Sequence, residues 1–169
     1  MGAGGIGGIT AALLSEAGHD VTAVTTNEEI CRRVSEQGYS LLGRGKLPSR
    51  NVRGRISLGV PKGESFDVVL LATQPPQVEE AARTALSALA PGGLFVCFQN
   101  GLCEERVAAI ASRSQVLGGV VAWGASMKEP GVYERTALGG FTLGALASRA
   151  SSASQSRVDD VARILSAVG

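Results

Sequence analysis

The first residues of the chain have a glycine spacing that could hold a phosphate group. Gly2, Gly4 and Gly7 follow the pattern Gly-x-Gly-x-x-Gly, and an apolar run that we expect to be helical comes directly after them. In a dinucleotide-binding turn, the first glycine permits a tight turn, the second lets the backbone approach a diphosphate, and the third allows close packing of the helix. The amino end of the helix then directs N–H groups toward the phosphates. The alternative is a glycine-rich turn without a ligand.

Small polar side chains occupy the place where the ribose of such a cofactor would be recognised. Thr25, Thr26 and Asn27 lie where a site that prefers NAD usually has an acidic residue. Their hydroxyl and amide groups leave room for the 2′-phosphate of NADP. Arg32 or Arg33 could bind that phosphate, because a guanidinium group is a planar fork of donors. We therefore predict NADP (NADPH), with NAD as an alternative; the two arginines could equally form a solvated helix face.

The sequence offers little to nucleophilic or metal-dependent chemistry. His19 is the only histidine, so Ser-His-Asp triads and zinc clusters have almost nothing to build on. Cys97 lies in an apolar run and is predicted to be buried in the core. Cys103 could be reactive near a helix start, although Glu104 and Glu105 would oppose its thiolate. We predict no metal site.

Composition narrows the class of protein further. A chain of 169 residues with 44% hydrophobic residues fits one domain with its own core. The formal net charge is +1 and 4% of the residues are aromatic. This composition does not indicate binding to nucleic acid or to an anionic membrane. No apolar run approaches the roughly 20 residues of a membrane span, and no signal peptide is visible. We expect a cytoplasmic protein that forms a single domain over residues 1–169.

Strands and helices alternate along the chain. Strands are predicted over 21–25, 55–58, 67–73, 94–98, 115–121, 132–135 and 141–143. Helices are predicted from the glycine turn to Gly18 and over 28–37, 77–89, 104–112 and 158–168. The stretches 39–55 and 148–156 are predicted to be irregular apart from the strand at 55–58. This alternation predicts an α/β fold with a doubly wound, mostly parallel sheet and helices on both faces.

The given sequence contains no segment for one strand of that sheet. A dinucleotide-binding turn should follow a strand, and only Met1 precedes Gly2. That strand would normally be central in the sheet, beside the strand predicted at 21–25. We therefore expect a truncated first strand and unpaired backbone in the middle of the sheet.

These motifs together resemble the N-terminal, NADP-binding domain of the ketopantoate reductase (2-dehydropantoate 2-reductase) family. The similarity covers nearly the whole chain and rests on the segments 2–7, 18–21, 99–105, 116–119, 130–132, 139–140 and 143–144. The turn Gln99-Asn100-Gly101 after a strand, followed by Gly118-Gly119 and a Pro130-Gly131 hairpin, is more specific than the glycine turn. The resemblance implies a Rossmann-like oxidoreductase that reduces ketopantoate, or another 2-oxo acid, with NADPH in pantothenate biosynthesis.

The resemblance also implies roles for particular residues. Asn100 corresponds to the family asparagine beside the nicotinamide ribose and the substrate, although Asn100-Gly101 could be only a turn. Ala125 falls where the family has a backbone contact to the cofactor. The expected cofactor-binding residues are Gly2, Ala3, Gly4, Gly5, Ile6, Gly7, Thr25, Thr26, Asn27, Thr73, Gln74, Asn100 and Ala125, and Asn100 is the expected substrate contact.

The chain departs from the family pattern at two positions. Thr26 stands where the family usually has an arginine for the 2′-phosphate, and Gln74 stands where a lysine is common. Both departures remove a positive charge that a cofactor phosphate and an acid substrate would favour.

The family's catalytic groups come from a second domain. In the family, a helical C-terminal domain supplies the lysine general acid, and this chain ends at Gly169 where that domain would begin. We therefore assign no catalytic residue and expect this chain alone to be inactive. A non-catalytic dinucleotide-binding or remnant module is the alternative; S-adenosylmethionine binding is disfavoured by the complete glycine pattern. The expected partner is a small 2-oxo acid, with a homodimer left open.

Overall fold

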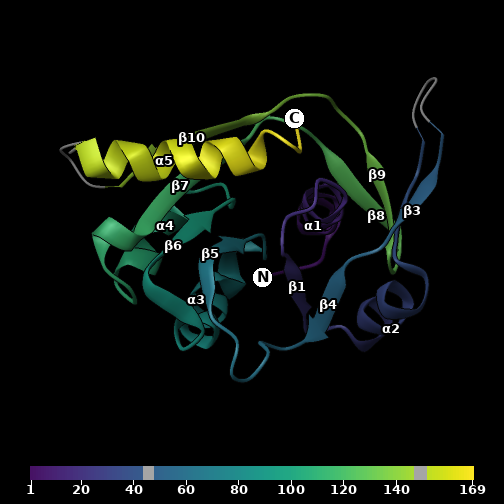
Figure 1. Ribbon diagram of the computed structural model, residues 1–169, viewed down its shortest axis with the longest axis horizontal. Coiled ribbons are helices and arrows are strands. Elements are labelled where there is room, and N and C mark those ends of the chain that lie inside the picture. Colours follow the sequence, from purple (N-terminus) through teal and green to yellow (C-terminus); the bar gives the residue numbers. More distant parts are fainter. Residues whose placement is uncertain (44–47, 147–151) are drawn as a thin grey trace.

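Five α-helices and ten strands form an α/β fold in this computed structural model, which describes residues 1–43, 48–146 and 152–169 (Figure 1). The helices are α1 (Gly5–Glu16), α2 (Glu28–Gln37), α3 (Val78–Leu86), α4 (Cys103–Ala108) and α5 (Ser152–Leu165), with the short 3-10 helices η1 (Pro75–Gln77) and η2 (Arg113–Gln115). The strands are β1 (Thr22–Thr25), β2 (Tyr39–Leu41), β3 (Arg50–Val52), β4 (Arg55–Leu58), β5 (Phe66–Leu71), β6 (Leu89–Cys97), β7 (Val116–Val121), β8 (Ala125–Glu129), β9 (Val132–Arg135) and β10 (Phe141–Ala145). The predicted α/β class is confirmed.

The strands are arranged in three sheets. The largest has the order β10-β7-β6-β5, in which β5, β6 and β7 are parallel and β10 is an antiparallel edge. A second, parallel pair joins β1 to β4. The third has the order β3-β2-β9-β8, in which only β2 and β9 are parallel.

The third sheet corrects the prediction that 39–55 is irregular. β2 and β3 are three residues each, too short to show a periodic pattern, and β2 pairs with β9, some 90 residues farther along the chain. β8 was not predicted either, although its hairpin turn at Pro130-Gly131 was noticed. Residues 44–47 of this stretch lie outside the described parts of the chain.

Two residues connect the largest sheet to the β1–β4 pair. The amino group of Met1 donates a hydrogen bond to the carbonyl oxygen of Leu70 at 2.7 Å. The N–H of Ala72 donates to the carbonyl oxygen of Met1 at 2.8 Å. On the other side, the N–H of Gly2 donates to Val24 O at 2.8 Å. Before Met1, at the level of the amino ends of β1 and β5, the described residues form no strand between β1 and β5. Among the described residues, the hydrogen bonds of Met1 and Gly2 therefore join the two sheets.

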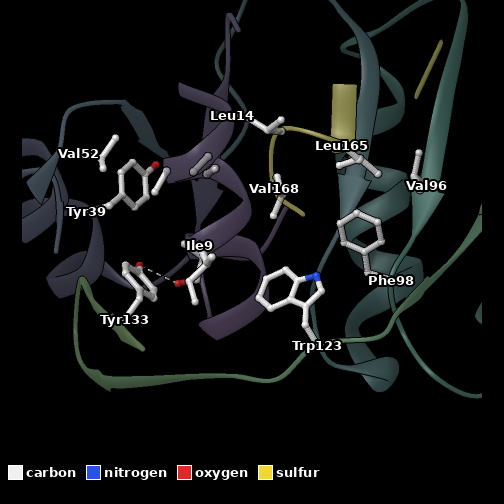
Figure 2. Close-up of a cluster of buried hydrophobic side chains, with 14 of the residues drawn as sticks. Ile9, Leu14, Tyr39, Val52, Val96, Phe98, Trp123, Tyr133, Leu165 and Val168 are labelled. Carbon is white, nitrogen blue, oxygen red and sulfur yellow. Dashed lines mark hydrogen bonds between the residues drawn. The ribbon is translucent and has the colours of Figure 1, made fainter. Parts of the chain in front are cut away.

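The hydrophobic core lies on both faces of the largest sheet. Side chains along β6 alternate between the two faces: Val96 contacts the cluster with α1 and α5, and Phe95 and Cys97 contact the cluster with α3 and α4. On the α1–α5 face, the rings of Phe98 and Phe141 lie 5.1 Å apart, and Figure 2 shows Phe98 near Leu165. Helices on both faces of the sheet are thus confirmed.

Several predicted element ends were wrong. The loop predicted at 148–156 is helical from Ser152 onward, and residues 147–151 lie outside the description. The helix predicted over 158–168 therefore begins six residues earlier, and Asp159 and Asp160 lie inside α5. Packing of Val161 and Leu165 against the sheet outweighs the weak helix propensity of the serines. α3 and α4 end earlier than predicted, at Leu86 and Ala108, and β6 begins earlier, at Leu89.

A tyrosine from the third sheet holds the glycine turn in place. Tyr133 on β9 lies against α1 (Figure 2), and its hydroxyl group donates a hydrogen bond to the carbonyl oxygen of Ala3 at 3.0 Å. A Cβ atom at Gly8 would overlap the Tyr133 ring, so glycine allows this close approach. The third sheet therefore supports the turn that precedes α1.

Replacing Tyr133 with phenylalanine should leave the buried carbonyl oxygen of Ala3 without its donor. We expect Tyr133→Phe to lower the free energy of unfolding by about 1–3 kcal/mol, measured by urea denaturation. Thr84→Val, at an exposed helical position, is the control and should change it by less than about 0.5 kcal/mol. Equal stability of Tyr133→Phe and the unmodified chain would contradict the assigned role.

Candidate active site

The amino end of α1 forms an open cradle of backbone N–H groups. α1 begins at Gly5, and Gly4 caps it in an extended conformation without any side-chain hydrogen bond. A Cβ atom built at Gly4 would meet no atom within 4 Å, so the space in front of the first turn is open. Free N–H groups and the positive end of the helix dipole attract an anion to such a place. The cradle therefore fits the diphosphate of a dinucleotide.

The remaining glycines of the turn are required by close backbone contacts. Gly2 has a φ of +92°, which favours glycine, and a Cβ atom there would lie 2.8 Å from the carbonyl oxygen of Ala72. A Cβ atom at Gly7 would overlap the carbonyl oxygen of Gly2. A Cβ atom at Gly5 would lie 3.0 Å from the backbone of Ala125, so Ala125 lies beside the turn. Ala3 is buried, and Ile6 lies in the first turn of α1.

The ends of β5 and β6 are joined by a buried glutamine. The Nε2 atom of Gln99 donates hydrogen bonds to the carbonyl oxygen of Thr73 at 3.1 Å and to its Oγ1 atom at 3.3 Å. Gln99 is buried, whereas Gln74 and Asn100 are exposed at the carboxyl ends of these strands. Sequence reasoning gave no role to Gln99; a polar residue ending the apolar run 94–98 was the available signal. Thr73, Gln74 and Asn100 therefore share one edge of the sheet.

The turn that carries Asn100 is constrained on its far side as well. Leu102 has a φ of +56° and is exposed, an uncommon conformation for a residue with a branched side chain. Cys103 is buried, and its thiol donates to the carbonyl oxygen of Asn100 at 3.8 Å. Arg106 of α4 donates to the carbonyl oxygen of Pro75 at 3.0 Å and so links the loops after β5 and β6.

Two of the residues predicted to lie near the ribose have structural partners. Thr25 is buried, and its Oγ1 atom accepts a hydrogen bond from the N–H of Asn27 at 3.1 Å. Asn27 caps α2, because its Oδ1 atom accepts from the N–H of Ile30 at 3.0 Å. Thr26 is exposed between them at the carboxyl end of β1. Thr26 and Asn27 are thus the exposed residues of the three, and Asn27 is engaged as the cap of α2.

The two arginines considered for a 2′-phosphate are both engaged in ion pairs. Arg32 contacts Glu29 and Glu36 at 2.9 Å each, and the hydrogen bond from Arg32 holds the pKa of Glu29 below its usual value. Arg33 contacts Glu129 at 3.1 Å. This arrangement matches the alternative in which both arginines form a solvated helix face.

Metal-ligating side chains, Cys97 and apolar helices were the other features to consider among the described residues. Within residues 1–43, 48–146 and 152–169, no three His, Cys, Asp or Glu side chains gather as metal ligands. Cys97 is buried as predicted, and burial raises the pKa of its thiol to about 12. Among the described helices, none combines the length and the apolar character that crossing a membrane requires.

Solved structures share this arrangement of elements. A D-mandelate dehydrogenase bound to NADH and anilino(oxo)acetate is 22% identical, with a TM-score of 0.87 over 99% of this chain and 53% of its own. A 2-dehydropantoate 2-reductase from Geobacter metallireducens is 21% identical, with a TM-score of 0.85 over 100% of this chain and 54% of its own. At these identities the likeness establishes the Rossmann-like fold.

Sequence comparisons give the family. The 2-dehydropantoate 2-reductase of Pyrococcus abyssi is 29% identical over 85% of this chain and 46% of its own length, and that of Pyrococcus horikoshii is 28% identical over 79% and 42%. The chain thus spans about half the length of these curated relatives. Residues 1–148 match the family model described as ketopantoate reductase PanE/ApbA. The chain therefore belongs to the ketopantoate reductase family.

Proposed function

We propose that this chain binds NADPH at the glycine turn and presents its nicotinamide for the reduction of a 2-oxo acid, with ketopantoate as the candidate substrate. The observation that carries the proposal is the open cradle at Gly4, in front of a helix end that has no side-chain cap. The relatives from Pyrococcus are 2-dehydropantoate 2-reductases, and the similar D-mandelate dehydrogenase holds NADH together with an oxo acid derivative.

In this proposal, the backbone from Gly2 to Gly7 binds the diphosphate. The N–H groups at the start of α1 neutralise part of its charge without any cationic side chain. Gly2 and Gly7 keep the turn tight against Ala72, and the hydrogen bond from Tyr133 fixes the carbonyl oxygen of Ala3. A cradle held in this way loses little freedom when a ligand binds.

The proposed preference for NADPH rests on Thr26. An acidic side chain at this exposed position would repel a 2′-phosphate, whereas a hydroxyl group can donate a hydrogen bond to it. Arg32 and Arg33 contribute only to the electrostatic potential near this position, because both form ion pairs with glutamates. The expected preference over NADH is consequently modest.

At the other end of the cofactor, we assign Thr73, Gln74, Asn100 and Ala125 to the nicotinamide side. NADPH, when bound, supplies a hydride for the carbonyl carbon of the substrate. Asn100 has an amide that can donate and accept hydrogen bonds together, so it can orient both a ribose hydroxyl group and a substrate oxygen. The bonds from Gln99 to Thr73 hold these two strand ends at a fixed separation. We treat residues 1–169 as one dinucleotide-binding domain.

Filling the cradle should weaken cofactor binding without unfolding the chain. Gly4 has a φ of −72°, which any residue adopts, so we expect Gly4→Val to fold normally and to bind NADPH at least about tenfold more weakly. Fluorescence titration measures the affinity. Gly144→Val is the matched control, because a Cβ atom there also meets no atom within 4 Å but lies on β10. Undiminished binding by Gly4→Val would remove the diphosphate from this turn.

Charge at position 26 should set the choice between the two cofactors. We expect the unmodified chain to bind NADPH more tightly than NADH, and Thr26→Asp to reverse that order through repulsion of the 2′-phosphate, by about threefold to tenfold. Parallel titrations of both cofactors provide the measurement, and Thr26→Ser, which keeps the hydroxyl group, is the control. A Thr26→Asp chain that still prefers NADPH would contradict the assignment.

A further inference from the structure

Gln99 is a buried polar residue beside the candidate active site. Its exposed fraction is 8%, and it precedes Asn100, which is exposed at the same edge of the sheet. Its Oε1 atom is buried and accepts no hydrogen bond from the described residues. Within this part of the chain, its side chain bonds only to Thr73, through Nε2. Gln99 is therefore connected to the site through Thr73.

The unpaired Oε1 atom argues against a purely stabilising role for Gln99. A buried acceptor without a donor costs free energy, and this cost offsets what the donor end of the same amide contributes. An apolar side chain of similar length would fill the space without that cost. The hydrogen bonds from Nε2 to Thr73 are consequently the feature that requires an amide at this position.

The chemistry of these two bonds determines the direction of the Thr73 hydroxyl group. The carbonyl oxygen of Thr73 carries no hydrogen, so the Gln99 atom that lies 3.1 Å from it must be the donor Nε2. The same Nε2 atom lies 3.3 Å from Oγ1 of Thr73, which must therefore act as an acceptor. The hydroxyl proton is left for another partner, and no other residue in the described ranges hydrogen-bonds to this side chain.

Thr73 lies next to the place that we assign to the cofactor. A Cβ atom at Gly2 would lie 2.9 Å from the backbone nitrogen of Thr73, so Thr73 is directly beside the first glycine of the cradle. Thr73 follows β5, is only partly buried, and shares the edge of the sheet with Asn100. A dinucleotide with its diphosphate in the cradle and its nicotinamide near Asn100 would pass Thr73 on the way.

We propose that Gln99 is a positioning residue: by donating to both oxygens of Thr73, it leaves the Thr73 hydroxyl proton to bind an oxygen of the nicotinamide–ribose half of NADPH. This inference rests on the proposed function and adds to it a buried residue that the cofactor does not touch. Without Gln99, the hydroxyl group could rotate and donate to a nearby carbonyl oxygen instead. The donor is thus oriented before the cofactor binds, which lowers the entropic cost of binding.

Two ligands with the same adenosine end test this role. NADPH carries the nicotinamide–ribose half, and adenosine 2′,5′-bisphosphate lacks it. We expect Thr73→Val to weaken NADPH binding by about threefold to tenfold, the value of one hydrogen bond, and to leave adenosine 2′,5′-bisphosphate binding unchanged. Gln99→Met, which removes the donor at similar length, should show the same selectivity with a loss of about threefold. Titration calorimetry measures both affinities.

Conservative and matched variants supply the controls. Thr73→Ser keeps the hydroxyl group and should bind both ligands as the unmodified chain does. Gln115→Met makes the same change at a glutamine that donates to the carbonyl oxygen of Gly93, inside β6 and not at its carboxyl end, at 3.5 Å. This variant should leave both affinities unaltered. In the double variant Gln99→Met, Thr73→Val, we expect no loss beyond that of Thr73→Val alone, because Gln99 acts through the hydroxyl group.

The outcomes separate this role from a structural one. Additive losses in the double variant overturn the proposal, as do equal losses for both ligands or a Gln99→Met chain that no longer folds, since each assigns Gln99 to the structure alone. Unchanged NADPH binding by Thr73→Val or Gln99→Met also overturns it and leaves the glycine turn as the binding site. An unmodified chain that binds neither ligand overturns the proposed function itself, and this inference with it.

Discussion

Three backbone hydrogen bonds of Met1 and Gly2 determine where the glycine turn lies. They connect Val24 of β1 to Leu70 and Ala72 at the end of β5, and so they bring the β1–β4 pair alongside the largest sheet. α1 starts three residues later, and its open amino end consequently lies at the edge where the strands finish. A ligand that bridges the two sheets can reach the helix dipole only because these bonds are made.

The glycine turn depends on contacts from three directions as well as on its own sequence. Ala72 restricts it from β5, Ala125 from the start of β8, and Tyr133 from β9. The third sheet therefore has a direct part in shaping the cradle, since both β8 and β9 belong to it. Its hairpin covers α1 and leaves the front of Gly4 open. The same close packing that requires glycine at positions 7 and 8 keeps the cradle rigid.

Local patterns in the sequence were enough for several elements and for the cradle itself. α2 was predicted with its observed bounds, because Asn27 and Gly38 are strong helix-end signals and its apolar residues recur at helical spacing. β4 and β9 were also predicted with their observed bounds, and the glycine spacing indicated the turn before α1. These features depend on residues close together in the chain, so the sequence determined them by itself.

Only the tertiary structure decided how distant segments meet. The residues of β2 show little strand pattern and form a strand because they pair with β9. The serines from Ser152 onward are helical because α5 packs against the sheet. Arg32 and Arg33, which the sequence alone left available for a phosphate, form ion pairs with glutamates of α2 and β8. Gln99 likewise acquired its role through Thr73, a partner 26 residues away. Contacts of this kind require the folded backbone to bring remote groups within hydrogen-bond distance, and no local spacing encodes that.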